Sequence, residues 1–476
     1  MGFAEYDRYD ALGLAELVAK GAVSPLELVD SAIERIEALN PRLNAVIFTD
    51  FDGARARAKA PLPDGPFRGV PFLLKDILGD LAGWPTRNGS RISPPVPMPF
   101  TATLVQRFLA GGLIPIGKTN VPEFGVVATT ESKLYGPACN PWNPAHSTGG
   151  SSGGSGAAVA SGMVPVAHAN DGGGSIRIPA SCNGLVGLKP TRGRNPLGPM
   201  LGDVMGGLAA EHIVSRSVRD TAAMLDVTAG AEPGDPYPAP PAPPSWRRAA
   251  EAPCPKLRIA FARSAPGGRA LDPQAVAAVE HAAKLCESLG HHVEEASPPV
   301  DNDAMVPAFM AIWSSGAAMQ IDGIAMMTGQ TPGPDNLEGL TRGLYAMGKA
   351  ISAPQLWGAI FQLQQMARAV AAWHADHDIW LTPTLGAPPP RNGSFPLDSE
   401  DVAAGFGAMT DYVPFTAIQN ATGQPAINVP LWWTPEGLPS GAARRGTALV
   451  RPETGALRSF RQASARTAAS ASSAPL

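Results

Sequence analysis

The sequence predicts an α/β protein with a central mixed, mostly parallel β-sheet covered by helices on both faces. Short apolar runs of strand length alternate with longer segments of helical period along most of the chain. The apolar run 70–74 precedes a helical pattern at 103–110, and the run 257–262 precedes another at 272–289. Alternation of this kind is typical of α/β proteins. No internal repeat interrupts it, and length alone suggests roughly three ordinary domains.

The first part of the chain, about 1–60, is expected to be helical. Residues 24–27, Ser-Pro-Leu-Glu, form a capping box with proline at the first helical position. Val29, Ile33, Ile36 and Leu39 then recur at helical spacing. This pattern predicts one apolar face that packs on the sheet.

The rest of the chain up to residue 439 divides into a core, a connection and a second α/β part. Over about 65–230 the patterns predict strands at 70–74, 113–116 and 163–167 and helices at 103–110, 155–161 and 219–229. The Pro/Ala-rich segment 233–255 is expected to be an extended surface connection. Over 256–439 we expect strands at 257–262, 292–294, 379–382 and 426–429 and helices at 272–289 and 354–374.

Composition limits the function classes. The 476 residues are 44% hydrophobic with a net charge of −4 and no basic run, so a large core is expected and nucleic acid is not an expected partner. No apolar stretch reaches membrane-spanning length, and the acidic N-terminus lacks a signal core, which predicts a cytoplasmic protein without a membrane partner. The four cysteines are scattered without a C-x-x-C pair, so neither a metal site nor a disulfide framework is expected.

The segment 112–119, G-L-I-P-I-G-K-T, fits the phosphate-binding pattern G-x-x-x-x-G-K-[ST] in its letters only. A phosphate cradle needs free backbone N–H groups and a helix that opens at the Lys-Thr pair. Here the interior is apolar, Pro115 has no N–H, and Pro122 follows closely. We therefore interpret the segment as a buried strand and its exit turn, and a nucleotide-binding enzyme as an unfavoured alternative.

The segment 150–154, G-S-S-G-G, fits the nucleophile elbow G-x-S-x-G, which requires a preceding strand and later acid and histidine partners. The preceding residues 143–149 are turn-like. His212, His281 and His291 lie downstream, so chain order alone leaves a Ser-His-Asp triad open, although none of them has a distinctive setting. His168 is interpreted as a packed residue after a strand.

Two Ser/Gly-rich stretches, 149–156 and 171–177, flank a predicted helix and strand, so both loops could converge at one sheet edge. Upstream, the strand 70–74 leads into Lys75. A lysine buried beside two serines would lose its charge and become a base.

Together these stretches resemble the amidase signature family. The resemblance extends from the N-terminal helices to about Pro439. It implies a single domain over 1–439 with the amidase-signature fold and with 65–230 as its catalytic core. Further segments that carry it are K-T-N-V-P-E-F at 118–124, N-P-W-N at 140–143, G-L-V-G-L-K-P-T at 184–191 and G-Q-P-A-I at 423–427. The family hydrolyses C–N amide bonds through an acyl-enzyme with a Ser-cisSer-Lys set, and no cofactor is implied.

The matching positions give Ser175 as the nucleophile, Ser151 as the bridging serine and Lys75 as the base. The chemistry supports these roles independently. A serine hydroxyl needs a base to take its proton, and neutral Lys75 can take a proton from Ser151, which takes one from Ser175. The reverse path protonates the leaving amine.

The glycines before Ser175 are expected to form an oxyanion hole, because their backbone N–H groups can converge on the developing charge. The glycines in question are Gly172, Gly173 and Gly174. The resemblance also implies bracing roles for Asp171 and Arg177 and places Gly125 in the acyl pocket, and Ser152 is expected to brace the Ser151 loop.

Within the family, the residues I-R-I-P after the nucleophile favour a free-standing amide hydrolase over the glutaminase-type subunit of a tRNA-dependent amidotransferase, which usually carries I-R-Q-P. The stretch 166–181 is similar to 6-aminohexanoate cyclic-dimer hydrolases and broad-specificity amidases, including urethane-cleaving ones. We expect a small or oligomeric amide, ester or carbamate substrate, with a homodimer left open. The substrate pockets are expected to include parts of 198–210 and 305–360.

The segment from Ser440 departs from the family's pattern, which continues into another strand and a C-terminal helix. It is rich in Ala, Ser and Arg and lacks a sustained apolar period. We expect 440–476 to be a disordered tail.

Overall fold

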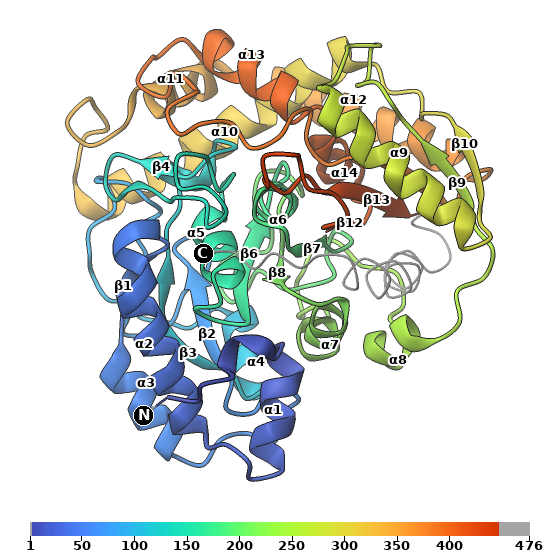
Figure 1. The fold of residues 1–476 in the computed structure, drawn as a ribbon. Helices are drawn as coiled ribbons and strands as arrows, with labels where there is room; N and C mark the ends of the chain where they lie inside the picture. The colour runs from blue at the N-terminus through green and yellow to red at the C-terminus, as the bar shows by residue number, and fades with distance from the viewer. Residues whose placement is uncertain (1, 447–476) are drawn as a thin grey trace.

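A computed structural model describes residues 2–446, and an eleven-stranded sheet runs through the whole of this part (Figure 1). The sheet is parallel in two groups, β3-β2-β6 and β11-β9-β10, and antiparallel elsewhere, which confirms the predicted α/β class with a mixed sheet. In spatial order the strands are β1 (Val46–Thr49), β3 (Ile114–Thr119), β2 (Pro71–Lys75), β6 (Val166–Asp171), β8 (Ala210–Ser215), β7 (Val186–Lys189), β12 (Ala426–Val429), β13 (Ala442–Gly446), β11 (Ile379–Pro383), β9 (Arg258–Phe261) and β10 (His292–Glu295). A separate hairpin pairs β4 (Glu131–Ser132) with β5 (Gly136–Pro137).

Helices cover the sheet and enclose three apolar clusters. Figure 1 shows α1–α4 around β2 and β3 at the blue end of the chain, and α10, α11 and α13 on the opposite side, near β4 and β6. The α-helices are α1 (Ala11–Ala19), α2 (Pro25–Leu43), α3 (Phe51–Lys59), α4 (Thr103–Ala110), α5 (Gly153–Ala160), α6 (Arg177–Asn183), α7 (Val218–Thr228), α8 (Trp246–Glu251), α9 (Pro273–Ser288), α10 (Asn302–Thr328), α11 (Gly339–Ala350), α12 (Ala353–Trp373), α13 (Val402–Tyr412) and α14 (Thr416–Thr422).

Two neighbouring parallel strands position the candidate site. Every residue of β2 and of β6 is buried, and the strands pair at Leu73 and Ala167. Because the carboxyl ends of parallel strands meet at one sheet edge, Lys75 at the end of β2 lies close to Asn170 and Asp171 at the end of β6. This pairing brings Lys75 to the start of the loop 171–177, and the Ser152 hydroxyl, which donates to the Asn170 carbonyl, joins the loop 149–156 to the same edge.

The interpretation of 112–119 as a strand is confirmed, since β3 runs through both the proline and the Lys-Thr pair. Lys118 is fully buried, donates to Thr86 and lies 3.8 Å from the Asp76 carboxylate. It is therefore held inside the protein and is not available to a phosphate.

The expectation of an extended connection over 233–255 is wrong in one place, because residues 246–251 form helix α8. The Ser245 hydroxyl accepts from the Arg248 N–H at 3.2 Å and caps the helix. Trp246 is 3% exposed, and the Arg194 guanidinium lies 5.0 Å from its ring. Burial of one aromatic residue thus holds a helix that composition alone did not indicate.

The expectation of disorder from residue 440 is also wrong over 442–446. That segment forms β13, which pairs antiparallel with β11 on one side and β12 on the other. Backbone hydrogen bonds to β11 and β12 order this segment, whatever its side-chain pattern. The expected tail beyond it, 447–476, lies outside the described residues.

Helix α10 is long and apolar enough to span a membrane by length and composition, contrary to the expectation that no stretch reaches that length. A core helix of a globular protein can have the same length and composition. Helix α10 packs against α11 and α12 and buries Ile312, Trp313 and Ile321, as a core helix does.

Candidate active site

Lys75 lies at the centre of the candidate site and is fully buried. Its Nζ lies 2.8 Å from the Ser151 Oγ and 2.5 Å from the Asn170 Oδ1. The Asn170 amide nitrogen donates to the Ile77 carbonyl at 2.9 Å, which directs the amide oxygen towards the lysine. The sequence did not single out Asn170, although it directly precedes Asp171.

Burial lowers the pKa of Lys75 from 10.5 to about 7, and the negative charges of Glu211 and Asp171 oppose the shift only in part. Both hydrogen-bond acceptors of its Nζ are neutral groups, which compensate little for lost hydration. Near neutral pH, a large fraction of Lys75 is thus an uncharged amine that can accept a proton.

Ser151 is 2% exposed and follows a cis peptide bond from Gly150. The Thr130 hydroxyl donates to the Gly149 carbonyl at 2.9 Å, and the Ser152 hydroxyl donates to the Asn170 carbonyl at 3.3 Å. The loop that carries Ser151 is thereby hydrogen-bonded to the end of β6.

The Asp171 side chain organises the glycine loop from inside. It accepts from the Gly174 N–H at 2.7 Å, from the Ile176 N–H at 3.2 Å and from two Arg177 nitrogens at 2.9 and 2.8 Å. Burial alone would raise its pKa, but the Arg177 guanidinium dominates with the other donors and lowers it to about 2. Both side chains are fully buried, so the pair is an internal clamp and not a surface ion pair.

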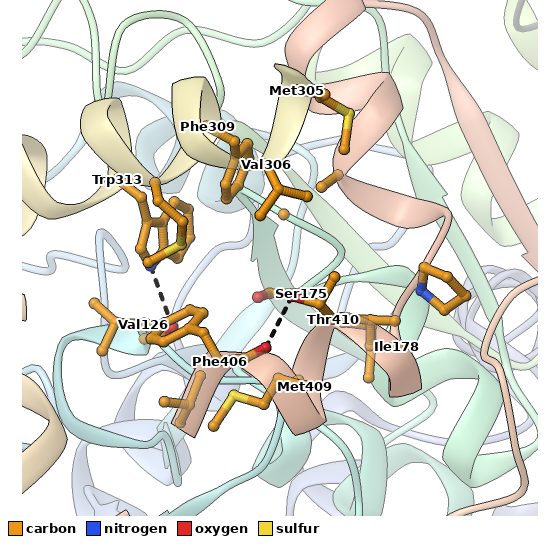
Figure 2. Close-up of a pocket in the computed structure, with 18 of the residues that line it drawn as sticks. Val126, Ser175, Ile178, Met305, Val306, Phe309, Trp313, Phe406, Met409 and Thr410 are labelled. Atoms are coloured by element: carbon orange, nitrogen blue, oxygen red, sulfur yellow. Dashed lines mark hydrogen bonds between the residues drawn. The ribbon is translucent and has the colours of Figure 1, made fainter. Parts of the chain in front are cut away.

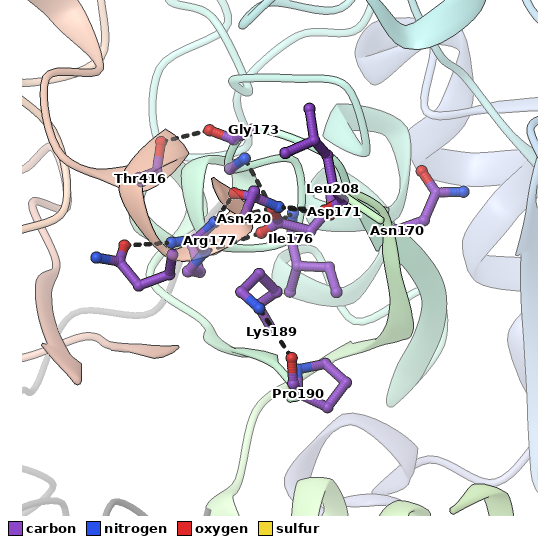
Figure 3. A network of polar contacts seen from close by, with 12 residues as sticks. Asn170, Asp171, Gly173, Ile176, Arg177, Lys189, Pro190, Leu208, Thr416 and Asn420 are labelled. Carbon is purple, nitrogen blue, oxygen red and sulfur yellow. Dashed lines mark hydrogen bonds and ion pairs between the residues drawn. The ribbon is translucent and has the colours of Figure 1, made fainter. Parts of the chain in front are cut away.

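Helix α14 completes this clamp from a distant part of the chain (Figure 3). Asn420 accepts from Arg177 at 2.7 Å and donates to the Asp171 carboxylate at 2.9 Å, while Gln419 accepts from Arg177 at 3.1 Å. The Thr416 hydroxyl donates to the Gly173 carbonyl at 2.6 Å. Local sequence offers no signal for these contacts, because they join residues more than 240 positions apart.

The geometry corrects one part of the predicted oxyanion hole. The N–H of Gly174 donates to Asp171 and therefore points away from a bound substrate. For the N–H groups of Gly172, Gly173 and Ser175 no acceptor is found within residues 2–446. These three N–H groups, without that of Gly174, are the candidates for an oxyanion.

Two cavities meet at Ser175, which is 6% exposed. The apolar cavity, about 720 Å³, lies between α10 and α13 (Figure 2). The Ser151 cavity, about 660 Å³, lies on the other side and reaches Ser151 and Asn170. Ser175, Gly125 and Trp313 line both.

The predicted pocket segments contribute as expected, with one omission. Residues of 198–210 line the Ser151 cavity, and residues of 305–360 line both. Residues 406–417, which form one wall of the apolar cavity, were not anticipated. A side chain at Gly125 would collide with the Ile77 Cδ1 at 2.8 Å, and its φ of +67° favours glycine, which explains this residue at the junction.

A Ser-His-Asp triad finds no support. His168 accepts from the Lys75 backbone N–H at 3.3 Å and lies 2.5 Å from the Glu211 carboxylate, which confirms it as a packed residue. Burial lowers the pKa of His212 to about 3. Among the hydrogen bonds of residues 2–446, none joins a histidine to Ser151 or Ser175. The same residues contain no group of three His, Cys, Asp or Glu side chains that could hold a metal ion.

The chain is similar to proteins of known family and structure. A model of the family Amidase matches residues 27–449. The 6-aminohexanoate-cyclic-dimer hydrolase of Paenarthrobacter ureafaciens is 37% identical over 450 residues, which cover 91% of this chain and 90% of the relative. A solved structure of 6-aminohexanoate cyclic dimer hydrolase complexed with substrate has a TM-score of 0.91 at 34% identity, with 98% of both chains covered. A bacterial aryl acylamidase of the amidase signature family has a TM-score of 0.86 at 26% identity, with 96% of both chains covered.

Proposed function

The chain belongs to the amidase signature family and is a hydrolase that acts on amides, and on that premise we propose that Lys75, Ser151 and Ser175 are its Ser-cisSer-Lys triad. The observation that carries this assignment is the 2.8 Å contact between the buried Lys75 Nζ and the Ser151 Oγ, in a cavity that also contains Ser175. A neutral amine with its lone pair towards a serine hydroxyl is an arrangement for proton transfer.

In the acylation step, the Ser175 oxygen attacks the substrate carbonyl carbon and gives its proton to Ser151, whose own proton passes to Lys75. Collapse of the tetrahedral intermediate breaks the C–N bond, and the same path in reverse protonates the leaving nitrogen. Water then takes the amine's place, gives its proton to the same path and releases the acid from Ser175.

The negative oxygen of the intermediate requires nearby donors. We assign this role to the backbone N–H groups of Gly172, Gly173 and Ser175, each worth about 3–4 kcal/mol in the transition state. Gly174 supports them indirectly, because its bond to Asp171 fixes the turn of the loop.

The proposed substrates are non-peptide amides, linear, cyclic or aryl, with esters and carbamates as further substrates of the same acyl-enzyme. The names of the relatives support this range, since one acts on a cyclic amide dimer and another on aryl amides. A cytoplasmic location and a homodimer remain predictions from the sequence.

Mass spectrometry of the acyl-enzyme tests the assignment. With an aryl amide or a serine-reactive phosphonate, we expect the adduct on Ser175 in the wild type and none in Ser175→Ala. Ser151→Ala should lose about 10²–10⁴-fold in acylation rate and still fold, because only proton transfer is affected. Ser288→Ala, at an exposed serine at the end of α9, is the matched control and should react as the wild type. An adduct on another serine would refute the proposal.

A further inference from the structure

The apolar cavity ends in a partition of five side chains, three of them apolar. Asn302, Val306 and Met310 of α10 and Phe406 and Thr410 of α13 line the apolar cavity and also a wider outer cavity beyond it, about 1370 Å³ in volume. Side chains that line both cavities stand between them. Figure 2 shows Ser175 between the α10 residues Val306 and Phe309 and the α13 residues Phe406 and Met409.

The proton path decides which half of the substrate enters which cavity. The leaving nitrogen receives its proton from Ser151, so it must lie on the Ser151 side of the scissile carbonyl. Ser151 lines the Ser151 cavity and is absent from the lining of the apolar cavity. The leaving amine therefore faces the Ser151 cavity, and the acyl group faces the apolar cavity.

The apolar cavity is suited to an uncharged acyl group. Of the described residues that line it, none is charged. Two of its polar groups are engaged with the protein, since the Thr410 hydroxyl donates to the Phe406 carbonyl at 2.8 Å and the Trp313 Nε1 donates to the Val126 carbonyl at 3.2 Å. The Asn302 side chain lies at the outer end, among the residues that line both cavities. A charged acyl group would lose hydration there without compensation.

The outer cavity, unlike the apolar cavity, is lined in part by charged side chains. Asp303, Arg269 and Asp411 line it, and the last two form an ion pair. An acyl chain that grows from Ser175 thus first fills apolar space, then meets the partition, and only past it would reach charged groups and water.

We propose that the apolar cavity binds uncharged, apolar acyl groups and that Val306, Met310 and Phe406 set the longest acyl chain that the enzyme accepts. This inference rests on the proposed function and adds the acyl specificity of the same site. Phe406 is the most informative position, because its ring is the largest of the three and its removal would join the two cavities.

The test is a series of p-nitroanilides with one leaving group and linear acyl chains of increasing length. For the wild type we expect kcat/KM to rise with each added methylene and then fall once the chain meets the partition. In Phe406→Ala, the chain length at which kcat/KM begins to fall should increase. The ratio of kcat/KM for a long acyl chain to kcat/KM for a short one should rise about tenfold or more. Phe406→Trp should move the fall to shorter chains. An ω-carboxylate at the chain end should reduce the wild-type rate for chains that stop short of the partition.

Met319→Ala is the matched control. Met319 also lies on α10 but lines the Ser151 cavity and not the apolar cavity. It should change the preference among leaving amines while the acyl-length profile keeps its wild-type shape. Phe406→Leu and Met310→Ala repeat the test with smaller perturbations, and thermal unfolding checks that each variant is folded.

An acyl-length profile that stays the same in folded variants at Phe406 and Met310 would overturn the inference, as would equal rates for charged and uncharged acyl groups. A profile that responds to Met319→Ala and not to Phe406→Ala would also overturn it, since it would reverse the two cavities. Failure of the proposed function is separate, because turnover would then persist in Ser175→Ala for every substrate.

Discussion

Lys75 illustrates how much of this chemistry is decided around one atom. Its Nζ has two close acceptors, the Ser151 hydroxyl and the Asn170 amide oxygen, and neither carries charge. The negative charges that favour an ammonium are those of Glu211, which lies against His168, and of Asp171, which is already bound by Arg177. Desolvation therefore outweighs attraction, and the pKa falls to about 7.

The rate of acylation should follow the neutral fraction of Lys75. It should rise as pH increases through about 7 and level off about one unit above, because the proton acceptor is the uncharged amine. Lys75→Arg should be as inactive as Lys75→Ala, because a guanidinium stays protonated. Stopped-flow acylation against pH measures both. Substantial activity in the arginine variant, or a rate that declines through neutrality in a folded protein, would contradict the role of base.

A substitution at Asn170 should also change the pKa of Lys75, because the Asn170 amide oxygen contacts the Lys75 Nζ. Asn170→Asp would place a carboxylate against the Lys75 Nζ, favour the ammonium and raise the pKa of Lys75. We expect the rise in rate to move by about one pH unit or more towards alkaline pH, with recovery of much of the rate at high pH. Asn170→Leu, which removes the hydrogen bond without adding charge, should lower the rate without that alkaline shift. Identical pH profiles for the aspartate variant and the wild type would contradict this coupling.

Among elements, the glycine loop after β6 is shaped by what covers it. Helix α10 lies over its first two glycines, since a Cβ on Gly172 would meet the Trp313 ring at 2.8 Å and one on Gly173 would meet the Phe309 ring at 3.3 Å. Helix α14 lies against the third. The glycines therefore serve packing as well as access to an oxyanion.

Gly173→Ala and Gly174→Ala should differ sharply. Gly174 has a φ of +139°, and its Cβ would lie 2.6 Å from the Ile178 Cδ1 and 2.8 Å from the Thr416 Cβ, so alanine there adds strain of about 1–3 kcal/mol. At Gly173 only a small shift of the Phe309 ring is needed. We expect the first variant to lose more thermal stability and more activity than the second, as measured by unfolding temperature and kcat/KM. Equal losses would show that packing against α14 does not restrict the loop.

Across the whole molecule, the sheet depends on a strand from the end of the described chain. β13 lies between β12 and β11 and supplies the hydrogen bonds between two groups of strands. One group consists of β1, β3, β2, β6, β8, β7 and β12, and the other consists of β11, β9 and β10. Its contribution is made by the backbone, because strand pairing orders the segment whatever its composition.

Two truncations separate this contribution from that of the remaining tail. A chain that ends after Gly446 keeps β13 and should retain both the acylation rate and most of its thermal stability. A chain that ends after Ser440 loses the strand, exposes two sheet edges and should unfold at a lower temperature or aggregate. Calorimetry and the Ser175 acylation rate distinguish the outcomes. Equal stability of the two chains would show that β13 adds nothing to the sheet.

The sequence predicts best where the signal is local. Helix α4 lies at the predicted residues 103–110, and Lys75 lies beside the loop of Ser175 because β2 and β6 pair in parallel. Long-range partners escaped prediction. Asn420 contacts Asp171 from 249 positions away. The strand β13 forms because the edges of β11 and β12 both offer backbone hydrogen bonds, although the local side-chain pattern does not favour a strand. The direction of the Gly174 N–H was missed for a related reason, since it depends on the rotamer of a buried carboxylate.

The bonds from α14 to the glycine loop have a consequence for the order of synthesis. A ribosome makes the segment 171–177 long before it makes Thr416, Gln419 and Asn420. Until those residues emerge, Arg177 and the Gly173 carbonyl lack the partners that hold them in the finished protein. The nascent chain therefore carries all three residues of the proposed triad without the α14 contacts of the glycine loop, and hydrolytic competence should arrive only after Asn420 has left the ribosome.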